Sequence, residues 1–153
     1  MTSPNYSACE KGQQIGSKTV SVSRTDLVKY AGASGDFNPI HINDRFATDV
    51  GLGGVIAHGM LTMGLAIDVV SQWTQDPTRI VDYQVRFAKP VPVPDTATNP
   101  DEPTVELEIT GVIGLVKEDS VRVDLTVMLG ETKVLAKAQA VVTTVGAPQK
   151  HSV

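Results

Sequence analysis

The sequence predicts an α+β fold with one buried helix and one long antiparallel sheet, and two observations support this prediction. Residues Gly59 to Trp73 are apolar around most of a helical circumference, as expected of a helix that is enclosed by protein. In the C-terminal half, apolar and polar residues alternate with a period of two in several segments, which is typical of an antiparallel sheet with one buried face.

The first third of the chain predicts a strand followed by two helices. The segment KTVSVS alternates and indicates a short strand. Ser23 and Asp26 form a start similar to a capping box, and the helix that follows is expected to end at Gly35. Asn43 is placed to cap a second, shorter helix that stops at Gly51.

The sheet is expected to follow the long helix. Its predicted strands are IVDYQVRF and three alternating stretches, from Val105 to Ile109, from Val121 to Val127 and from Val134 to Ala140. In the last stretch, the buried face is expected to carry small residues that suit a strand crossing close to a helix: Val134, Ala136, Ala138 and Ala140. The Pro-rich segment KPVPVPDTATNPDEP cannot be a central strand and is predicted to be a connecting loop.

A sheet that curls around one long central helix is the hot-dog fold. Residues 1–153 are expected to form a single domain of this kind, with residues 1–14 and 146–153 as frayed ends. A lone domain leaves one sheet edge uncovered, so we expect a dimer in which two sheets join edge to edge. The partner is either a second copy of the chain or a different hot-dog subunit.

Composition and charge exclude several classes of protein. The net charge is −4 without a basic block, so no nucleic-acid partner is expected. The single cysteine, Cys9, excludes an internal disulfide, and three scattered histidines do not suggest a metal. No signal-peptide pattern is present, and the longest apolar run is short and contains Asp68. We therefore expect a cytoplasmic protein with no membrane association, metal or cofactor.

The stretch SGDFNPIHIND combines an acid, an amide and an imidazole. Gly35 lets the chain turn just before Asp36, and Pro39 fixes its own φ and biases Asn38 toward an extended conformation. Such a turn would place Asp36 and His41 about a water molecule apart, where they could orient water and exchange protons with it. An ordinary turn, with Asp36 as a cap and His41 bonded to a buried carbonyl, fits the same residues.

The segment GGVIAHGM leads directly into the long helix. The first N–H groups of a helix have no partner within it and favour negative charge. Gly59 has no side chain to obstruct a ligand, so its N–H could hold a carbonyl oxygen as that oxygen becomes an enolate. His58 is expected to donate to a backbone carbonyl, and Thr62, away from the polar side of the helix, to shape the site. Simple close packing of helix against sheet is the alternative.

Together these groups meet the needs of water addition to a double bond conjugated with a thioester carbonyl. The segment YAGASGDFNPIHINDRFA resembles the hydratase motif of the MaoC-like (R)-specific enoyl-CoA hydratases, and IAHGMLTMG and YQVRFAKPVPVPDT resemble later segments of that family. The likeness covers roughly Thr19 to Val142. Within the family, the length and the run AHGMLTMG are most similar to the catalytic subunit of the two-subunit (3R)-hydroxyacyl-ACP dehydratases of mycolic-acid synthesis.

The resemblance implies a role for each motif. Asp36 and His41 would be the catalytic pair, and Asn38 would shape the site. The Gly59 N–H would bind the thioester carbonyl. The implied reaction is reversible hydration of trans-2-enoyl thioesters of CoA or acyl carrier protein to (3R)-3-hydroxyacyl thioesters. No catalytic serine is implied, because Ile67 stands where some relatives carry one.

Two other functions stay open. A hot-dog acyl thioesterase also uses a carboxylate and a helix N-terminus, although the Asp-x-Asn-Pro-x-His loop favours hydration. A non-catalytic hot-dog subunit would complete the acyl site of a partner, although it should lack the Asp and His pair. Arg45, Arg86 or Lys89 could meet an acidic acyl carrier protein, but ordinary solvated charges are the simpler interpretation.

Overall fold

The computed structural model describes residues 4–96 and 98–145. In this part of the chain, six strands form one antiparallel sheet in the order β1-β3-β4-β6-β2, and the short β5 pairs with β4. The strands are β1 (Gln14–Val22), β2 (Ile80–Phe87), β3 (Val105–Val116), β4 (Ser120–Leu129), β5 (Thr132–Lys133) and β6 (Leu135–Thr143).

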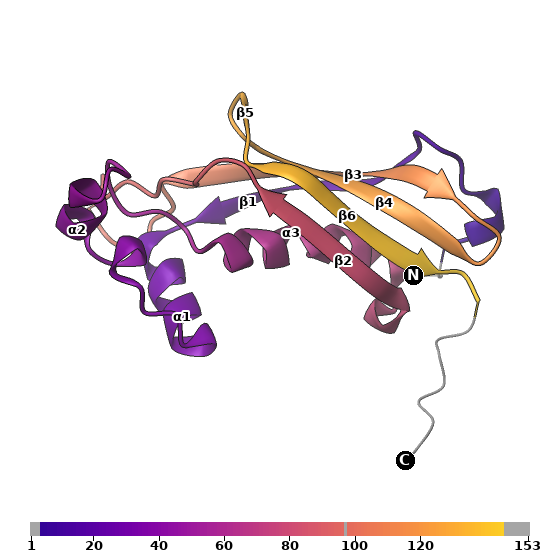
Figure 1. Ribbon diagram of the computed structural model, residues 1–153, viewed down its shortest axis with the longest axis horizontal. Helices are drawn as coiled ribbons and strands as arrows, with labels where there is room; N and C mark the ends of the chain where they lie inside the picture. Colours follow the sequence, from indigo (N-terminus) through magenta and orange to yellow (C-terminus); the bar gives the residue numbers. More distant parts are fainter. Residues whose placement is uncertain (1–3, 97, 146–153) are drawn as a thin grey trace, which may run out of the picture.

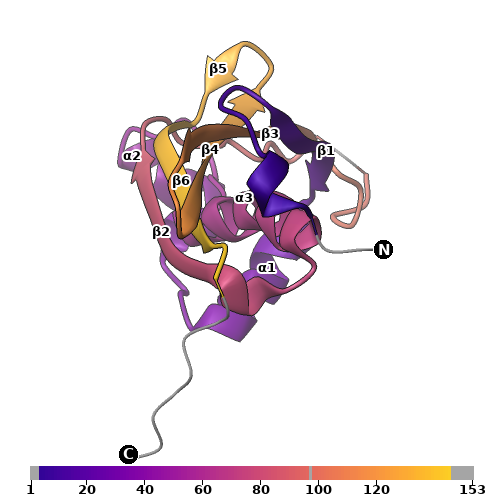
Figure 2. The same cartoon turned by 90° about the vertical axis from the view of Figure 1, so that its right-hand side faces the viewer.

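One long helix, α3 (Gly59–Thr74), runs along the inner face of this sheet (Figure 1). Seen end-on, the sheet curls over α3, with β1 on one side of the helix and β2 on the other (Figure 2). Helices α1 (Arg24–Ser34) and α2 (Asp44–Asp49) lie together at one end of the sheet. This arrangement confirms the predicted α+β architecture and the hot-dog fold.

The core lies between α3 and the inner face of the sheet. Buried side chains of α3 are Thr62, Ala66, Val69, Val70 and Thr74. They face alternate residues of the strands, among them Leu107, Ile109, Val123, Leu125 and Ala140, each at most 3% exposed. Full burial of one such Val, Leu or Ile side chain stabilises the fold by roughly 1.5–3 kcal/mol, so this contact fixes the helix under the sheet.

The N-terminal segment differs from the frayed end that was expected. Residues Tyr6–Ala8 form a 3-10 turn, and the Tyr6 ring packs edge-on against Trp73, with ring centroids 5.5 Å apart. The Gly12 N–H donates to the Ile113 carbonyl at 2.8 Å, which leads the chain into β1. Residues 1–3 and the expected C-terminal end, 146–153, lie outside the described residues.

The start of β6 also differs from the predicted alternation. Ala136 is exposed rather than buried, and Leu135 takes the inward position at 1% exposure. The cause is an irregularity in pairing with β2: Arg86 lies opposite Lys137, but the next residue, Phe87, lies opposite Leu135. An extra residue in one strand of a pair re-aims its neighbours, so simple period-two reasoning fails at this point.

Helix α1 carries the capping box that the sequence predicted. The Ser23 hydroxyl accepts from the Asp26 N–H at 3.2 Å, and the Asp26 carboxylate accepts from the Ser23 N–H at 2.9 Å. At the other end Gly35 adopts φ +76°, a left-handed conformation that strongly favours glycine, and its N–H donates to the Ala31 carbonyl. Both ends of α1 are thus fixed, and so is the point where the following loop begins.

Within the described residues, no helix combines the length and the apolar character needed to cross a lipid bilayer. The cytoplasmic location expected from the sequence stays a prediction.

Replacing Ser23 with Ala should lower the free energy of unfolding by about 1 kcal/mol, because the Asp26 N–H loses its acceptor at a buried helix start. Urea unfolding followed by circular dichroism measures this change. Ser17→Ala, at an exposed position in β1, is the control and should change stability little. Equal effects of the two substitutions would contradict the role given to the cap.

Candidate active site

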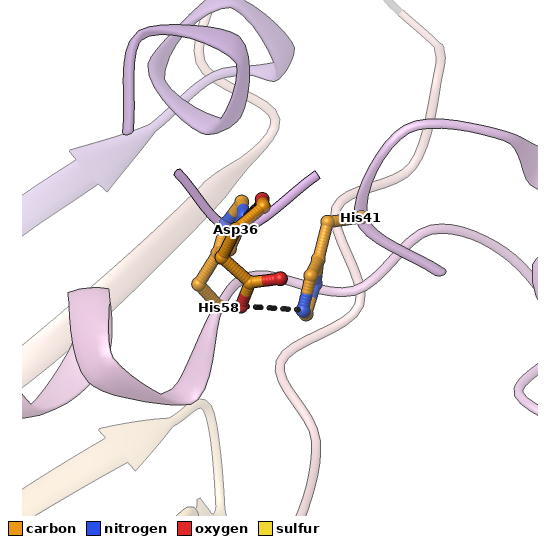
Figure 3. Close-up of side chains that lie close together, drawn as sticks. All are labelled: Asp36, His41 and His58. Carbon is orange, nitrogen blue, oxygen red and sulfur yellow. Dashed lines mark hydrogen bonds and ion pairs between the residues drawn. The ribbon is translucent and has the colours of Figure 1, made fainter. Parts of the chain in front are cut away.

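The loop after α1 holds Asp36 by its main chain and by one of its carboxylate oxygens. The Asp36 N–H donates to the Ser34 hydroxyl, and Asp36 Oδ1 accepts from the Asn38 N–H, both at 3.2 Å. The second oxygen, Oδ2, lies 3.9 Å from His41 Nε2. Figure 3 shows the carboxylate pointing toward the His41 ring. The turn therefore fixes the carboxylate and leaves Oδ2 facing the imidazole.

Asn38 and Pro39 turn the chain from the acid to the imidazole. The Asn38 side chain accepts from the Ile40 N–H at 3.2 Å and caps a 3-10 turn, η2 (Pro39–His41), that has proline at its first position. Proline suits this place because its missing N–H would have no partner there. The His41 N–H donates to the Asn38 carbonyl at 3.0 Å, so the turn places His41 across from Asp36.

His41 is buried, with a side chain 8% exposed, whereas the Asp36 side chain is 51% exposed. His41 Nδ1 lies 2.7 Å from the Ile56 carbonyl oxygen. Because a carbonyl only accepts, Nδ1 donates its proton to the Ile56 carbonyl, and Nε2 is the ring nitrogen that faces Asp36. The Asp36 and His41 side chains are therefore each held by one polar atom, and the other polar atom of each faces the opposite side chain. A catalytic role for the pair stays a prediction.

His58, the residue just before α3, supports this pair from behind. Its side chain is 1% exposed, and Nε2 donates to the main-chain carbonyl of Asp36 at 3.0 Å, the type of bond expected from the sequence. Its ring stacks on the His41 ring, with centroids 3.9 Å apart and an angle of 23° between the ring planes. The Tyr30 ring also lies beside the His58 ring, with centroids 4.8 Å apart. His58 thus contacts both the backbone of Asp36 and the ring of His41.

A cavity of about 360 Å³ opens beside His41 and the N-terminus of α3. Gly59 and Thr62, from the first turn of the helix, line it together with residues on three other segments: Ile56 and Ala57, Phe87 to Val91, and Val134 and Leu135. As the first residue of α3, Gly59 has an N–H without a partner inside the helix. Asp36 does not line the cavity and approaches this region only through His41.

A polar link that the sequence does not predict fixes the segment that precedes α3. Asp44 Oδ1 accepts from Arg24 Nη2 at 2.8 Å and from the Val55 N–H at 2.9 Å. It joins α1, α2 and the segment before α3, and the hydrogen bond from Arg24 is the main cause that lowers the Asp44 pKa. An acid in the first turn after the cap Asn43 was visible in the sequence, but its partner 20 residues away was not.

The potential metal-ligand atoms of Asp36, His41 and His58 lie within 4.8 Å of one another. A metal bound by two imidazoles lies in the plane of each ring, whereas these two rings are stacked face to face. His58 Nε2 is also engaged with the Asp36 carbonyl. The geometry therefore suits water and proton transfer better than metal ligation, and the expected absence of a metal stays a prediction.

The family model of the MaoC-like domain matches residues 7–128. The chain therefore belongs to the MaoC-like family, and the family expected from its motifs is confirmed. The fold of the chain is similar to the solved structure of a MaoC-like dehydratase, with a TM-score of 0.82 and 34% sequence identity. This likeness covers 92% of the chain and 42% of the solved one.

Two characterised relatives carry related names. The (R)-specific enoyl-CoA hydratase of Rhodospirillum rubrum is 31% identical over 135 residues, which are 84% of this chain and 90% of that protein. The 3-hydroxyacyl-thioester dehydratase X of Mycobacterium tuberculosis is 45% identical over 69 residues, 45% of this chain. The match spans only 24% of that longer dehydratase. These two relatives are thus named as a hydratase and a dehydratase.

Replacing Asp44 with Asn should destabilise the protein at neutral pH and matter less in acid. A carboxyl with a lowered folded-state pKa contributes stability above its usual value near 3.8 and loses it as the pH falls further. The difference in unfolding free energy between wild type and variant should therefore shrink as the pH drops through this range.

Urea unfolding at several pH values measures that difference. Asp49→Asn, at the exposed end of the same helix, is the control. A difference that stays constant down to acidic pH would contradict an ionised Asp44 as the joint between α1 and α2.

Proposed function

We propose that the chain catalyses the reversible hydration of trans-2-enoyl thioesters to (3R)-3-hydroxyacyl thioesters. The observation that carries this proposal is the 3.9 Å separation of Asp36 Oδ2 and His41 Nε2 beside a cavity that begins at a helix N-terminus. The gap is too long for a direct hydrogen bond and suits a water that donates one hydrogen to each atom. The family membership supports the same reaction.

The two acceptor atoms can activate such a water. In hydration, the water oxygen attacks C3 of the enoyl group while one of its protons passes to the pair formed by Asp36 and His41. The electron pair of the double bond moves toward C2 and the thioester carbonyl, which becomes an enolate. A proton then returns to C2 from the same face, and the pair ends as it began. Dehydration is the reverse of these steps.

The N-terminus of α3 is suited to the enolate oxygen. The Gly59 N–H has no intrahelical partner, and the helix dipole adds a partial positive charge at this end. Most of the cavity lining is apolar, so a hydrogen bond to a developing negative charge would be stronger there than in water. No cofactor is needed in this scheme, because both protons and the oxygen come from water.

A hot-dog thioesterase is the alternative enzyme. It would attack the thioester carbonyl carbon and release a free thiol, whereas a water between Asp36 and His41 would attack C3. Assay of free thiol from an acyl-CoA distinguishes the two reactions. A purely non-catalytic subunit is disfavoured, because such a subunit has no use for an aspartate Oδ2 and a histidine Nε2 held face to face.

The carrier of the acyl group is CoA or an acyl carrier protein. Lys89 lines the cavity and is exposed, while Arg86 and Arg45 are exposed on β2 and α2. In the described residues none of these three takes part in an ion pair. They are available to the phosphate groups of either carrier.

Asp36→Asn should reduce hydration of a short trans-2-enoyl-CoA by about 10²-fold or more, because the amide cannot accept a proton from the water. His41→Gln should act similarly. Loss of the conjugated enoyl absorbance follows the reaction, and Asp101→Asn, on an exposed loop, is the control. Full activity of Asp36→Asn would remove Asp36 from the mechanism, and inactivity of every form would require a partner subunit or a carrier-bound substrate.

The sheet edge at β2 supports an assembly of two hot-dog domains. Among the described strands β2 pairs only with β6, and its other side carries unpaired backbone groups. Val81 and Phe87 on this strand are each 50% exposed. Open, apolar edges promote pairing with another chain, so we include in the proposal a homodimer or a heterodimer with a second hot-dog subunit.

Val81→Lys should weaken this association, because a charged side chain on an edge strand opposes strand pairing. Light scattering of the purified chain should give the mass of two copies for wild type and a shift toward one copy for the variant. Val116→Lys, an exposed position on β3, is the control. A wild-type chain of single mass would point to a different subunit as the partner, which co-purification can identify.

A further inference from the structure

The space that the missing side chain of Gly59 leaves open is filled by Phe87. A Cβ at residue 59 would lie 3.1 Å from Phe87 Cε1 and 3.3 Å from both Cδ1 and Cζ. These distances are shorter than normal van der Waals contact, so the ring would have to move to accept even a methyl group. Gly59, which the sequence predicts to leave room for a ligand, is therefore also in contact with the Phe87 ring.

Three sets of contacts fix the backbone of the strand that carries this ring. Phe87 is the last residue of β2 and lies opposite the inward-facing Leu135, at the irregularity in pairing described above. The next two N–H groups, of Ala88 and Lys89, both donate to the Val134 carbonyl, at 3.0 and 3.2 Å. Earlier in the strand the Tyr83 hydroxyl donates to the Met63 carbonyl of α3 at 2.9 Å, which ties β2 to the helix.

The position of Phe87 is not explained by core packing. Its side chain is 50% exposed, so it contributes less hydrophobic stabilisation than a buried ring. It nevertheless lines the same cavity as His41, Gly59 and Thr62. An exposed aromatic ring that rests on the first residue of α3 lies where the thioester group would have to bind.

We propose that Phe87 is a positioning residue for the thioester: its ring, seated on Gly59, keeps water from the start of α3 and orients the carbonyl toward the Gly59 N–H. This inference rests on the proposed function and adds to it a residue outside the motifs that predicted the site. An apolar ring beside the N–H strengthens its hydrogen bond to the enolate oxygen, because fewer water molecules compete there. The ring acts only through Gly59, so the two residues form one unit.

Single substitutions give the first test. Phe87→Ala should lower kcat for a short trans-2-enoyl-CoA by about tenfold with a smaller change in KM, since the interaction is strongest in the transition state. Phe87→Leu, which keeps an apolar side chain, should recover part of the loss. Val116→Ala, at an exposed apolar position on β3 away from the cavity, is the control and should leave kcat unchanged. A purely structural role of Phe87 would leave kcat unchanged in the folded fraction.

A double-mutant cycle gives the decisive test. Gly59→Ala should by itself cost about tenfold in kcat, because the new methyl group displaces the ring. In the Phe87→Ala background the same methyl group meets open space, so Gly59→Ala should cost almost nothing more. The double variant should thus be about tenfold, not about 100-fold, slower than wild type. Multiplicative losses would overturn the proposal, because they would mean that the two residues act independently.

A binding measurement separates this inference from the proposed reaction. Butyryl-CoA has the same thioester carbonyl but no double bond, so calorimetry can repeat the cycle without turnover. If wild type binds butyryl-CoA but hydrates no enoyl thioester, the proposed function fails while a non-additive binding cycle still supports the role of Phe87. Additive effects on binding, or no binding of butyryl-CoA by wild type, would overturn that role.

Discussion

The hydrogen bond from His58 Nε2 to the main-chain carbonyl of Asp36 is the contact on which the site depends. It joins the loop after α1 to the start of α3, and its two residues are 22 positions apart in the sequence. The stacked His41 ring is held by the same side chain. Because His58 is almost fully buried, losing this bond would leave a buried ring N–H without a partner. The position of the carboxylate therefore follows from the position of the helix.

The Asp36 and His41 side chains are held in the same way, each by a hydrogen bond at one of its two polar atoms. Asp36 Oδ1 accepts from the Asn38 N–H, and His41 Nδ1 donates to the Ile56 carbonyl. Each side chain is thereby fixed in orientation, and in His41 the proton is also fixed on Nδ1. The remaining atoms, Oδ2 and Nε2, face each other with no bond between them. The bonds that form the turn therefore also produce the facing arrangement on which the proposed reaction rests.

Much of this could be predicted from the sequence because the signals are local. The capping box of α1, the bounds of β2 and the start of α3 follow from short-range patterns, and the structure agrees with them. The inward position of Leu135 could not be predicted, because it depends on how β6 pairs with a strand some 50 residues earlier. The Arg24–Asp44 link and the ring on Gly59 could not be predicted for the same reason: each joins residues far apart in the sequence that only the folded chain brings together.

Strand β2 connects the site with the expected assembly. It forms one of the two edges of the described sheet, and its last residue, Phe87, rests on Gly59 at the proposed carbonyl site. An isolated edge strand is restrained on one side only, whereas a partner strand would restrain it on both. Pairing along β2 would therefore also steady the ring that covers the start of α3. In this fold, association and catalysis would be coupled through a single strand, because the same backbone carries the interface and one wall of the cavity.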